Sequence, residues 1–335
     1  MQIILAPMQG LTEVLFRRVY ENCFPGIMDH AISPFLSLAN GELKHADKKV
    51  KDVLPEENIG SIPLVPQILG KEPEAFINLA NYLFDLGYEE VNWNIGCPVR
   101  RVTAKHRGSG ILPYPTEIEA ILSNIIPRLK GALSVKMRLG LTNSNDIYSI
   151  IPILNRYPIK NVTIHPRTGQ QAYSGIVDLD TFAKVIPLLK CEVIYNGDIV
   201  TLQDYNYISR RFPQITKFMI GRGILQNPPL ACRIKQSSLE HFTSAADDTA
   251  TVHGMHDPFQ RKDEEIYVTH TRDLMLQLLD AIDEHLPSAE AKARKTKEYW
   301  CLMFKAFHVS EEKKNQVLHC STFSETRRAI EKAIQ

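Results

Sequence analysis

Short apolar runs alternate with longer segments of helical periodicity between residues 3 and 221. Apolar or alternating runs of this length predict β-strands. The predicted strands are Ile3–Met8, Gly26–Ala31, Leu64–Leu69, Glu89–Ile95, Leu133–Leu139, Asn161–Pro166, Glu192–Asn196 and Lys217–Gly221. The amphipathic helices predicted between them are Thr12–Asn22, Glu74–Leu86, Pro115–Leu129, Asp146–Tyr157, Leu179–Leu189 and Leu202–Arg210. This alternation predicts an α/β fold, a TIM (β/α)8 barrel.

A doubly wound open sheet is the competing arrangement for alternating strands and helices. Such a sheet normally carries a Gly-x-Gly-x-x-Gly turn after its first strand, and neither this pattern nor a P-loop follows Ile3–Met8. Ser33-Pro34 breaks the chain after the second predicted strand, and residues 44–60 form a polar excursion without a clear helical face. The pattern therefore favours the closed barrel.

The last third of the chain has a different pattern. Residues 236–263 are rich in Ser, Thr, Ala and Asp, a composition typical of an extended linker. Helical periodicity returns in Ile266–His285, Ala289–Phe307 and Phe323–Ile334, which predicts a small all-helical bundle. The predicted organisation is a catalytic barrel over residues 1–235, a linker over 236–263 and a helical domain over 264–335.

Composition limits the class of protein. The chain has 335 residues, 44% of them hydrophobic and 23% charged, and its formal net charge is +1, so any basic surface must be local. Its six cysteines include no Cys-x-x-Cys pair, which argues against a zinc ribbon, an iron–sulfur cluster or a disulfide framework, and no metal is expected. The N-terminus lacks signal-peptide features, and no run approaches the ~20 apolar residues that span a bilayer. We expect a soluble, cytoplasmic protein with no membrane partner.

Polar or glycine-rich residues follow most of the predicted strands. In a TIM barrel the active site lies at the C-terminal ends of the strands. Taken singly, Gln67 could cap a strand, Lys136 could be an inward ion-pair partner and His165 could be a satisfied core histidine. Taken together, these ends predict one converging site, formed by Pro7, Met8, Gln9, Gln67, Asn94, Cys97, Lys136, His165, Asn196, Gly197, Asp198, Gly221 and Arg222.

The last two strand ends indicate the kind of ligand. Glycine-containing turns after strands seven and eight of such barrels often bind a phosphate, and Arg222 could pair with it. Pro7, Met8 and Gln67 would contact a flat ring system. Lys136 and His165 could hold the polar edge of the ring or the ribityl and phosphate end. This combination predicts flavin mononucleotide (FMN).

Cys97 follows the fourth predicted strand, in the stretch Asn94-Ile95-Gly96-Cys97-Pro98. A loop rich in basic residues and without an acidic one comes next, and Gly108-Ser109-Gly110 closes it. A thiol beside a positive loop suits chemistry on an anionic partner. The alternative is a buried cysteine at a tight turn. The basic residues of this loop are Arg100, Arg101, Lys105 and Arg107.

These motifs resemble, in order, those of the bacterial tRNA-dihydrouridine synthases (the Dus family). The similar stretches cover about the first 225 residues. The resemblance implies FMN as cofactor, NADPH (with NADH possible) as reductant, and reduction of the uracil C5–C6 bond in tRNA. The C-type subgroup, which modifies U16 of the D-loop, is the most similar, although residues 105–110 depart from its usual Gly-Gly-Ala run. The stretches are 5–10, 66–70, 92–102, 107–112, 135–140, 165–168, 195–199 and 219–223.

The resemblance also implies roles for individual residues. Cys97, protonated at an unperturbed pKa near ~8.5, would donate the proton to C5, and Asn94 would hold the base or steady the flavin. The target uridine would be flipped out of its stack. No protein partner is implied. The residues expected to contact tRNA are Arg100, Arg101 and Arg107 in the loop, and Arg294, Lys295 and Lys297 in the basic helical segment 292–305.

Three alternatives stay open from the residues alone. The basic helix could be a solvated face whose aromatic residues belong to the core. The barrel could act on a free pyrimidine, as relatives of dihydroorotate dehydrogenase do. It could also be a non-catalytic RNA-binding protein. The basic loop after Cys97 and the helical tail argue against the free pyrimidine. The predicted flavin contacts of the barrel, together with Cys97, argue against a non-catalytic protein.

Overall fold

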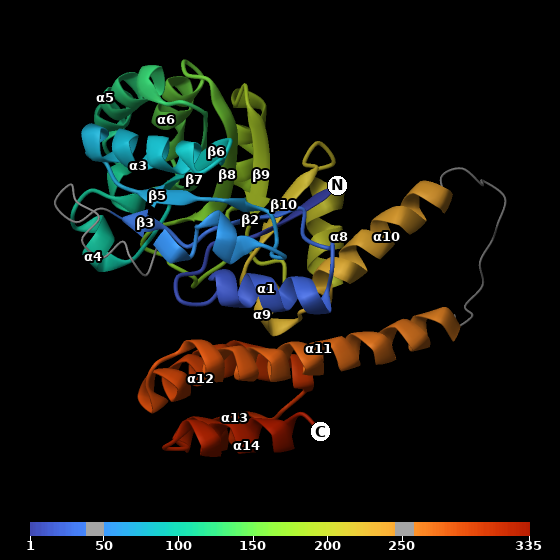
Figure 1. Cartoon of the computed structure of the whole chain (residues 1–335). Coiled ribbons are helices and arrows are strands. Elements are labelled where there is room, and N and C mark those ends of the chain that lie inside the picture. Colours follow the sequence, from blue (N-terminus) through green and yellow to red (C-terminus); the bar gives the residue numbers. More distant parts are fainter. Residues whose placement is uncertain (38–49, 245–257) are drawn as a thin grey trace.

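The strands of the computed structural model form one parallel sheet (Figure 1), and the structure describes residues 1–37, 50–244 and 258–335. The strand order is β3-β5-β6-β7-β8-β9-β10-β1-β2-β4. Every strand pair in this order is parallel. The strands are β1 (Gln2–Leu5), β2 (His30–Ile32), β3 (Leu36–Ser37), β4 (Leu64–Val65), β5 (Gln67–Leu69), β6 (Glu90–Ile95), β7 (Ala132–Gly140), β8 (Ile159–Thr168), β9 (Glu192–Asn196) and β10 (Lys217–Ile220).

Two interrupted strands close this sheet into a barrel. β2 pairs with β4 and β3 pairs with β5, while only Pro66 separates β4 from β5. The two ends of the strand order are therefore parts of the same pair of strands, and the sheet returns on itself. The Ser33 hydroxyl accepts a hydrogen bond from the backbone N–H of Gln67 at 2.9 Å, which bridges the interruption. The predicted TIM barrel is confirmed, although the second predicted strand begins later and is split.

Helices follow the strands around the barrel. All six helices predicted in this part of the chain are found. Two of them, 115–129 and 179–189, end earlier than predicted and continue as short 3-10 turns. These turns contain Pro127 and Pro187, and proline lacks the backbone N–H that an α-helix needs. The helices are α1 (Val14–Cys23), α3 (Pro73–Asp85), α4 (Arg100–Thr103), α5 (Pro115–Ile125), α6 (Asp146–Leu154), α7 (Leu179–Val185), α8 (Leu202–Arg211), α9 (Arg222–Gln226) and α10 (Leu230–Ser244); the 3-10 turns are η1 (Pro55–Asn58), η2 (Gly108–Ile111), η3 (Ile126–Arg128) and η4 (Ile186–Leu188).

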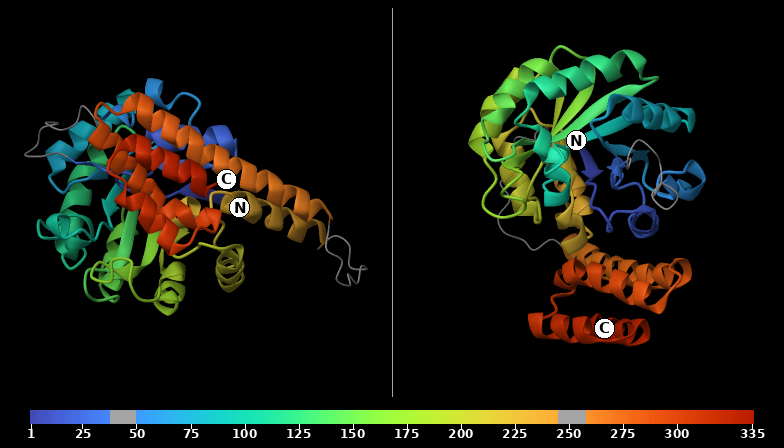
Figure 2. Two further views of the ribbon diagram at one scale, coloured as in Figure 1. Left: turned by 90° about the horizontal axis from the view of Figure 1, so that it is seen from below. Right: turned by 90° about the vertical axis from the view of Figure 1, so that its left-hand side faces the viewer.

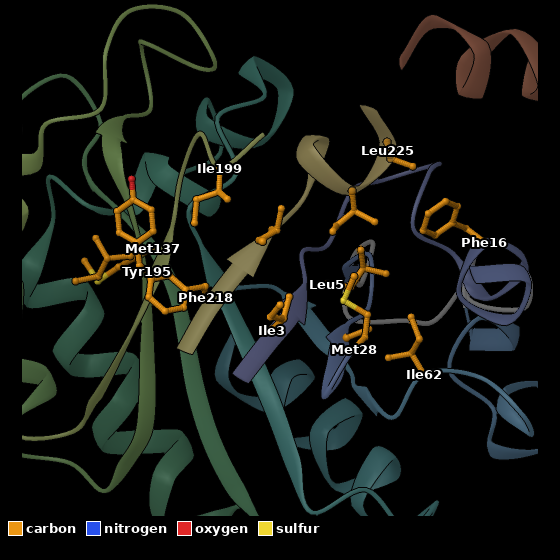
Figure 3. Close-up of a cluster of buried hydrophobic side chains, with 14 of the residues drawn as sticks. Ile3, Leu5, Phe16, Met28, Ile62, Met137, Tyr195, Ile199, Phe218 and Leu225 are labelled. Atoms are coloured by element: carbon orange, nitrogen blue, oxygen red, sulfur yellow. The ribbon is translucent and has the colours of Figure 1, made fainter. Parts of the chain in front are cut away.

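Alternation along the strands divides the side chains between two environments. One set points outward and packs against the helices in the main core, as Ile3, Leu5 and Phe218 do in Figure 3. A smaller apolar cluster from the inner face contains Ile4 and Met219. On β6, β7 and β8 the inner positions are polar, so the barrel interior carries the functional side chains while the outer positions stabilise the fold.

The C-terminal helices form a separate layer beside the barrel (Figures 1 and 2). They confirm the three predicted helices and add α13, which the pattern missed because Val317 is its one buried residue. The stretch 245–257 of the predicted linker lies outside the described residues, and α10 and α11 extend into the rest of it. Part of the predicted polar excursion, residues 44–49, also lies outside them, and the division into domains stays a prediction. The helices are α11 (Pro258–His285), α12 (Ala289–Met303), α13 (Glu311–His319) and α14 (Phe323–Ala333), with the 3-10 turn η5 (Phe304–Phe307).

Within the described ranges, no helix combines the length and the apolar character that crossing a membrane requires.

Removing a large side chain from the main core should destabilise the barrel. Phe218 is 1% exposed, and its ring packs edge-on against Tyr205 at 5.1 Å between centroids. We expect Phe218→Ala to lower the free energy of unfolding by about 3–5 kcal/mol, measured by urea titration. Tyr207→Ala, at a side chain that is 56% exposed, is the control and should cost under about 1 kcal/mol. Equal losses in the two variants would contradict this account.

Candidate active site

A cavity of about 300 Å³ opens at the C-terminal ends of the strands. A volume of this order suits a small-molecule or cofactor site. The structure brings together all the residues that the sequence predicts for the cofactor and the thiol chemistry, although their roles stay predictions. These residues are Pro7, Met8, Gln9, Gln67, Asn94, Cys97, Lys136, His165, Asn196, Gly197, Asp198, Gly221 and Arg222, joined by Arg101.

Strand register explains how residues distant in sequence meet in this cavity. Asn94 on β6 lies opposite Lys136 on β7, and Arg138 on β7 lies opposite His165 on β8. Side chains two positions apart on a strand share a face, so Lys136 and Arg138 both point inward. The inner face of three neighbouring strands therefore presents one polar surface to the cavity.

A buried chain of amide hydrogen bonds runs from β5 across β6 to β7. The Gln67 Nε2 donates to Asn92 Oδ1 at 2.8 Å, and the Asn94 Nδ2 donates to Gln67 Oε1 at 2.7 Å. The Asn92 Nδ2 in turn donates to Ser134 Oγ at 2.9 Å. Because buried amides without partners are costly, this chain fixes the orientation of Gln67 and Asn94.

The same Asn94 holds the turn that carries the thiol. Its Oδ1 accepts hydrogen bonds from the backbone amides of Gly96 at 3.0 Å and of Cys97 at 2.9 Å. The Cys97 carbonyl accepts from the amide and hydroxyl of Ser109, at 3.0 and 3.1 Å. Gly108, at a φ of +56°, lies so close that a Cβ there would be 2.6 Å from the Cys97 carbonyl oxygen. The turn before the thiol and the small-residue loop after it thus fix the position of Cys97.

The Cys97 thiol is protonated at neutral pH. Burial raises its pKa above the ordinary value. The Val99 backbone amide and the charges of Arg138 and Lys136 lower the pKa, but by less than burial raises it. The side chain is 8% exposed, yet it lines the cavity. Cys97 is therefore a candidate proton donor rather than an activated thiolate.

Two further titratable groups in the cavity have lowered pKa values. Burial, aided by the charge of Arg138, lowers the pKa of Lys136 to about 7, and its Nζ donates to Asn196 Oδ1 at 2.8 Å. Burial and the surrounding cations hold the pKa of His165 well below its usual range, so the ring is neutral. Arg167 Nη1 lies 3.1 Å from His165 Nε2, and because a guanidinium can only donate, the ring proton is on Nδ1.

Asp198 lies between two guanidinium groups. It accepts hydrogen bonds from Arg167 Nη1 at 2.9 Å and from Arg222 Nη2 at 3.0 Å. The Arg167 side chain is 2% exposed, whereas that of Arg222 is 33% exposed. Arg222 is thus the cation of this group that a phosphate entering from solvent would reach. Direct contact between Asp198 and a cofactor stays a prediction.

The donor set fits an FMN-like ligand. Lys136, Arg138 and Arg222 line the cavity with the neutral His165, and Asp198 is the one acidic residue among the described lining. A surplus of donors suits an anionic ligand rich in acceptors. Met8 and Ala6 pack within 3.2 Å of where a Cβ of Gly221 would lie, so the glycine allows close approach at the β10 end.

Sequence reasoning assigned no role to three residues of this site. Arg138 is 2% exposed and donates from Nε to the Gly96 carbonyl at 3.0 Å. The sequence feature that could have identified it is its position two residues after Lys136, on the same face of the strand. Arg167 shares the inner face of β8 with His165 and holds Asp198. Tyr173 lies in the loop after β8 with its ring 4.6 Å from the Arg222 guanidinium, and no periodicity marks it.

The predicted tRNA contacts fall into two groups. Arg100 and Arg101 are exposed beside the cavity, whereas Arg107 forms an ion pair with Glu72 at 2.6 Å. On α12, Arg294 is exposed and Lys297 donates to the Cys320 carbonyl at 2.6 Å. The Lys295 ammonium binds the Gly10 carbonyl and the Glu13 carboxylate of the barrel, and its predicted contact with tRNA stays a prediction.

Comparisons with known proteins agree with this geometry. The sequence profile described as "Dihydrouridine synthase (Dus)" matches residues 4–325. The chain is 30% identical to tRNA-dihydrouridine synthase B of Pasteurella multocida over 240 residues, covering 71% of this chain and 70% of that protein. It is 27% identical to tRNA-dihydrouridine(16) synthase of Cupriavidus necator, covering 70% and 73%.

Among solved structures, the old yellow enzyme from Trypanosoma cruzi is similar, with a TM-score of 0.50 and 10% identity over 70% of this chain and 88% of that one. At this identity the likeness concerns the barrel fold alone.

The half-buried Lys136 should make the stability of the FMN-free protein depend on pH. Its pKa is about 7 in the fold and 10.5 ordinarily, so the unfolded chain binds more protons in this window and stability rises with pH through it. Below pH 7 the fold retains the full cost of a buried charge. We expect Lys136→Met to stabilise the protein most near pH 6 and progressively less toward about pH 9 in urea titrations.

Lys130→Met is the control for this effect, because that side chain is 54% exposed and pairs with Asp85 at the surface. Its difference from the wild type should not vary with pH. A difference for Lys136→Met that is constant across the range would contradict the buried-charge account.

Proposed function

The chain belongs to the dihydrouridine synthase (Dus) family of flavin-dependent oxidoreductases, and on that premise we propose that it reduces a uridine of tRNA to 5,6-dihydrouridine. The observation that carries this proposal is a protonated thiol, Cys97, fixed at the rim of a cavity rich in cationic donors. FMN and the reductant NADPH, with NADH as the alternative, belong to the same proposal. The position U16 rests on the resemblance to the C-type subgroup.

Cys97 is the proposed acid. Bound FMN would supply a hydride to C6 of the uracil ring, and C5 then needs a proton from the protein. The Cys97 thiol holds that proton at neutral pH, because burial raises its pKa. The thiolate left behind faces the positive charges of Arg138, Lys136 and Arg101, which lower the pKa and so favour the charged form. Their position makes proton release easier without ionising the resting thiol.

The other lining residues would bind and orient the cofactor. Arg222 offers a partly exposed guanidinium to the phosphate, and the Nδ1–H of His165 and the Nζ of Lys136 offer donors to polar groups deeper in the cavity. Pro7 and Met8 line the cavity from the loop after β1 and would contact the ring system. Asn196 would act through Lys136, because its Oδ1 accepts a hydrogen bond from the Lys136 Nζ.

Asn94 acts through the turn that it holds. Both of its polar atoms are engaged, Oδ1 with the amides of Gly96 and Cys97 and Nδ2 with Gln67. Because Oδ1 already accepts two hydrogen bonds, only the second hydrogen of Nδ2 is left for a base. Its main proposed role is therefore to place the Cys97 thiol.

The tRNA must bring one flipped uridine to this cavity. A base in a stacked helix cannot reach the strand ends, so unstacking precedes the reaction. Arg100 and Arg101 would contact the backbone near the cavity, and Arg294 and Lys297 would do so on α12. Such phosphate contacts supply affinity and make it depend on salt.

Replacing Cys97 tests the chemistry. Cys97→Ala should retain FMN and accept electrons from NADPH, yet form dihydrouridine on unmodified tRNA about 10²–10⁴ times more slowly, because the acid is missing. Cys191→Ala is the control, since that thiol precedes β9 at the opposite end of the barrel. Both rates can be followed by NADPH oxidation and by dihydrouridine content. Turnover on tRNA at the wild-type rate would refute the assignment.

Salt titration tests the proposed RNA surface. The double variant Arg101→Gln/Arg294→Gln should bind tRNA more weakly, with a log–log salt slope smaller by about one unit for each phosphate that is no longer neutralised. Arg128→Gln/Arg156→Gln removes the same charge from residues that pair with Glu74 and Glu119, and serves as control. An unchanged slope and affinity in the first variant would show that these residues are solvated.

Mapping dihydrouridine in tRNA from a strain that lacks the protein would identify the modified position.

A further inference from the structure

The loop after β1 joins the cavity to the C-terminal helices. Side chains of this loop line the cavity, namely Pro7, Met8, Gln9 and Leu11. Its backbone is bound from the other side by α12. The Lys295 Nζ donates to the Gly10 carbonyl and also to the Glu13 carboxylate, the latter at 3.0 Å. The Tyr299 hydroxyl donates to the Leu11 carbonyl at 2.8 Å.

These contacts are largely shielded from solvent, which makes them strong constraints. The Lys295 side chain is 14% exposed, and Tyr299 is fully buried with its ring stacked on Phe16 of α1 at 6.0 Å between centroids. A buried ammonium or hydroxyl without its partner retains the full cost of its desolvation. The loop carbonyls are therefore held in one place as long as α12 stays docked.

The same helix also contacts the neighbouring element at the cavity, the helix that follows β10, and β10 pairs directly with β1. α12 and the turn η5 pack against α9, which begins at Arg222. Arg222 is the cation placed for the phosphate, whereas Met8 and Gln9 lie in the loop proposed to face the ring. One helix of the tail thus contacts two neighbouring elements that line the cavity, the loop after β1 and the helix after β10.

We propose that Lys295 and Tyr299 are positioning residues of the flavin site, so that the C-terminal helices complete the cofactor site in addition to contacting RNA. This inference rests on the proposed function, in that FMN occupies the cavity. Lys295 and Tyr299 act through the backbone of residues 10 and 11, and they fix the adjoining side chains of Met8, Gln9 and Leu11 against the cofactor. They do not touch the reacting atoms.

The chain offers a matched control on the same helix. Lys292 is also on α12, its side chain is 21% exposed, and its Nζ donates to Asp283 of α11 at 2.6 Å. It therefore resembles Lys295 in residue type, burial and ion pairing. It differs in that its partner belongs to the tail and not to the barrel.

The test measures FMN binding to the full-length protein without tRNA. Apoprotein of the wild type, Lys295→Met, Tyr299→Phe and Lys292→Met would be titrated with FMN by fluorescence, and the absorption spectrum and NADPH reduction rate of each holoprotein recorded. A hydrogen bond to a charged group is worth roughly one to two powers of ten in an equilibrium constant. We expect the Kd to rise about tenfold in Lys295→Met, and about threefold in Tyr299→Phe, where a neutral hydrogen bond is removed.

Both positioning variants should also shift the flavin absorption bands and slow reduction, whereas Lys292→Met should match the wild type in all three measurements. Unchanged binding and spectra in both Lys295→Met and Tyr299→Phe would overturn the inference. Equal weakening in Lys292→Met would also overturn it, since the effect would then come from a loosened helix. If Lys295→Met fails to fold, Tyr299→Phe decides alone. A wild type that binds no FMN would refute the proposed function, and the inference with it.

Discussion

Polar residues on the inner face of β5, β6 and β7 impose the constraint on which the site depends. A buried amide must find partners, and in this barrel Gln67, Asn92 and Asn94 satisfy one another across neighbouring strands. The last amide of that chain uses its oxygen to hold the backbone of the Cys97 turn. The thiol is thus placed by the strand register itself, and a change in any member of the chain would leave a buried donor or acceptor unpaired.

The pKa values of the basic groups in the same cavity are lowered because several cations lie close together where there is little water. Lys136 lies near Arg138, and both pKa values are lowered, to about 7 and about 10, mainly by burial. His165 is kept neutral for the same reason. Among the described lining residues Asp198 alone offers a carboxylate. The site's own charge is therefore destabilising, and an anionic ligand would relieve that cost, which is the physical reason to expect a phosphate-bearing cofactor there.

Hydrophobic periodicity predicted the barrel well because each strand alternates between core and cavity. The positions of Lys136 and His165 followed from that alternation and from the rule that barrel sites lie at strand ends. The closure through β2, β3, β4 and β5 could not be predicted, since it depends on pairing between short segments around Pro66. Tyr173 could not be predicted either, because loop residues have no periodicity and only the fold brings its ring to Arg222.

The basic segment of α12 shows why charge in a sequence does not measure charge available to a partner. Lys292, Arg294, Lys295 and Lys297 stand within six positions, yet Lys292 pairs with Asp283, Lys295 with the barrel and Lys297 with a backbone carbonyl. In an α-helix, neighbouring residues point to different faces. The basic residues of this segment are therefore divided between contacts within the tail, contacts with the barrel and the exposed surface. Among these four, Arg294 alone is exposed, and the other three are half-buried. A helix that uses a lysine to hold a loop lining the cavity contributes to the structure of that cavity, in addition to any contact that its exposed face makes.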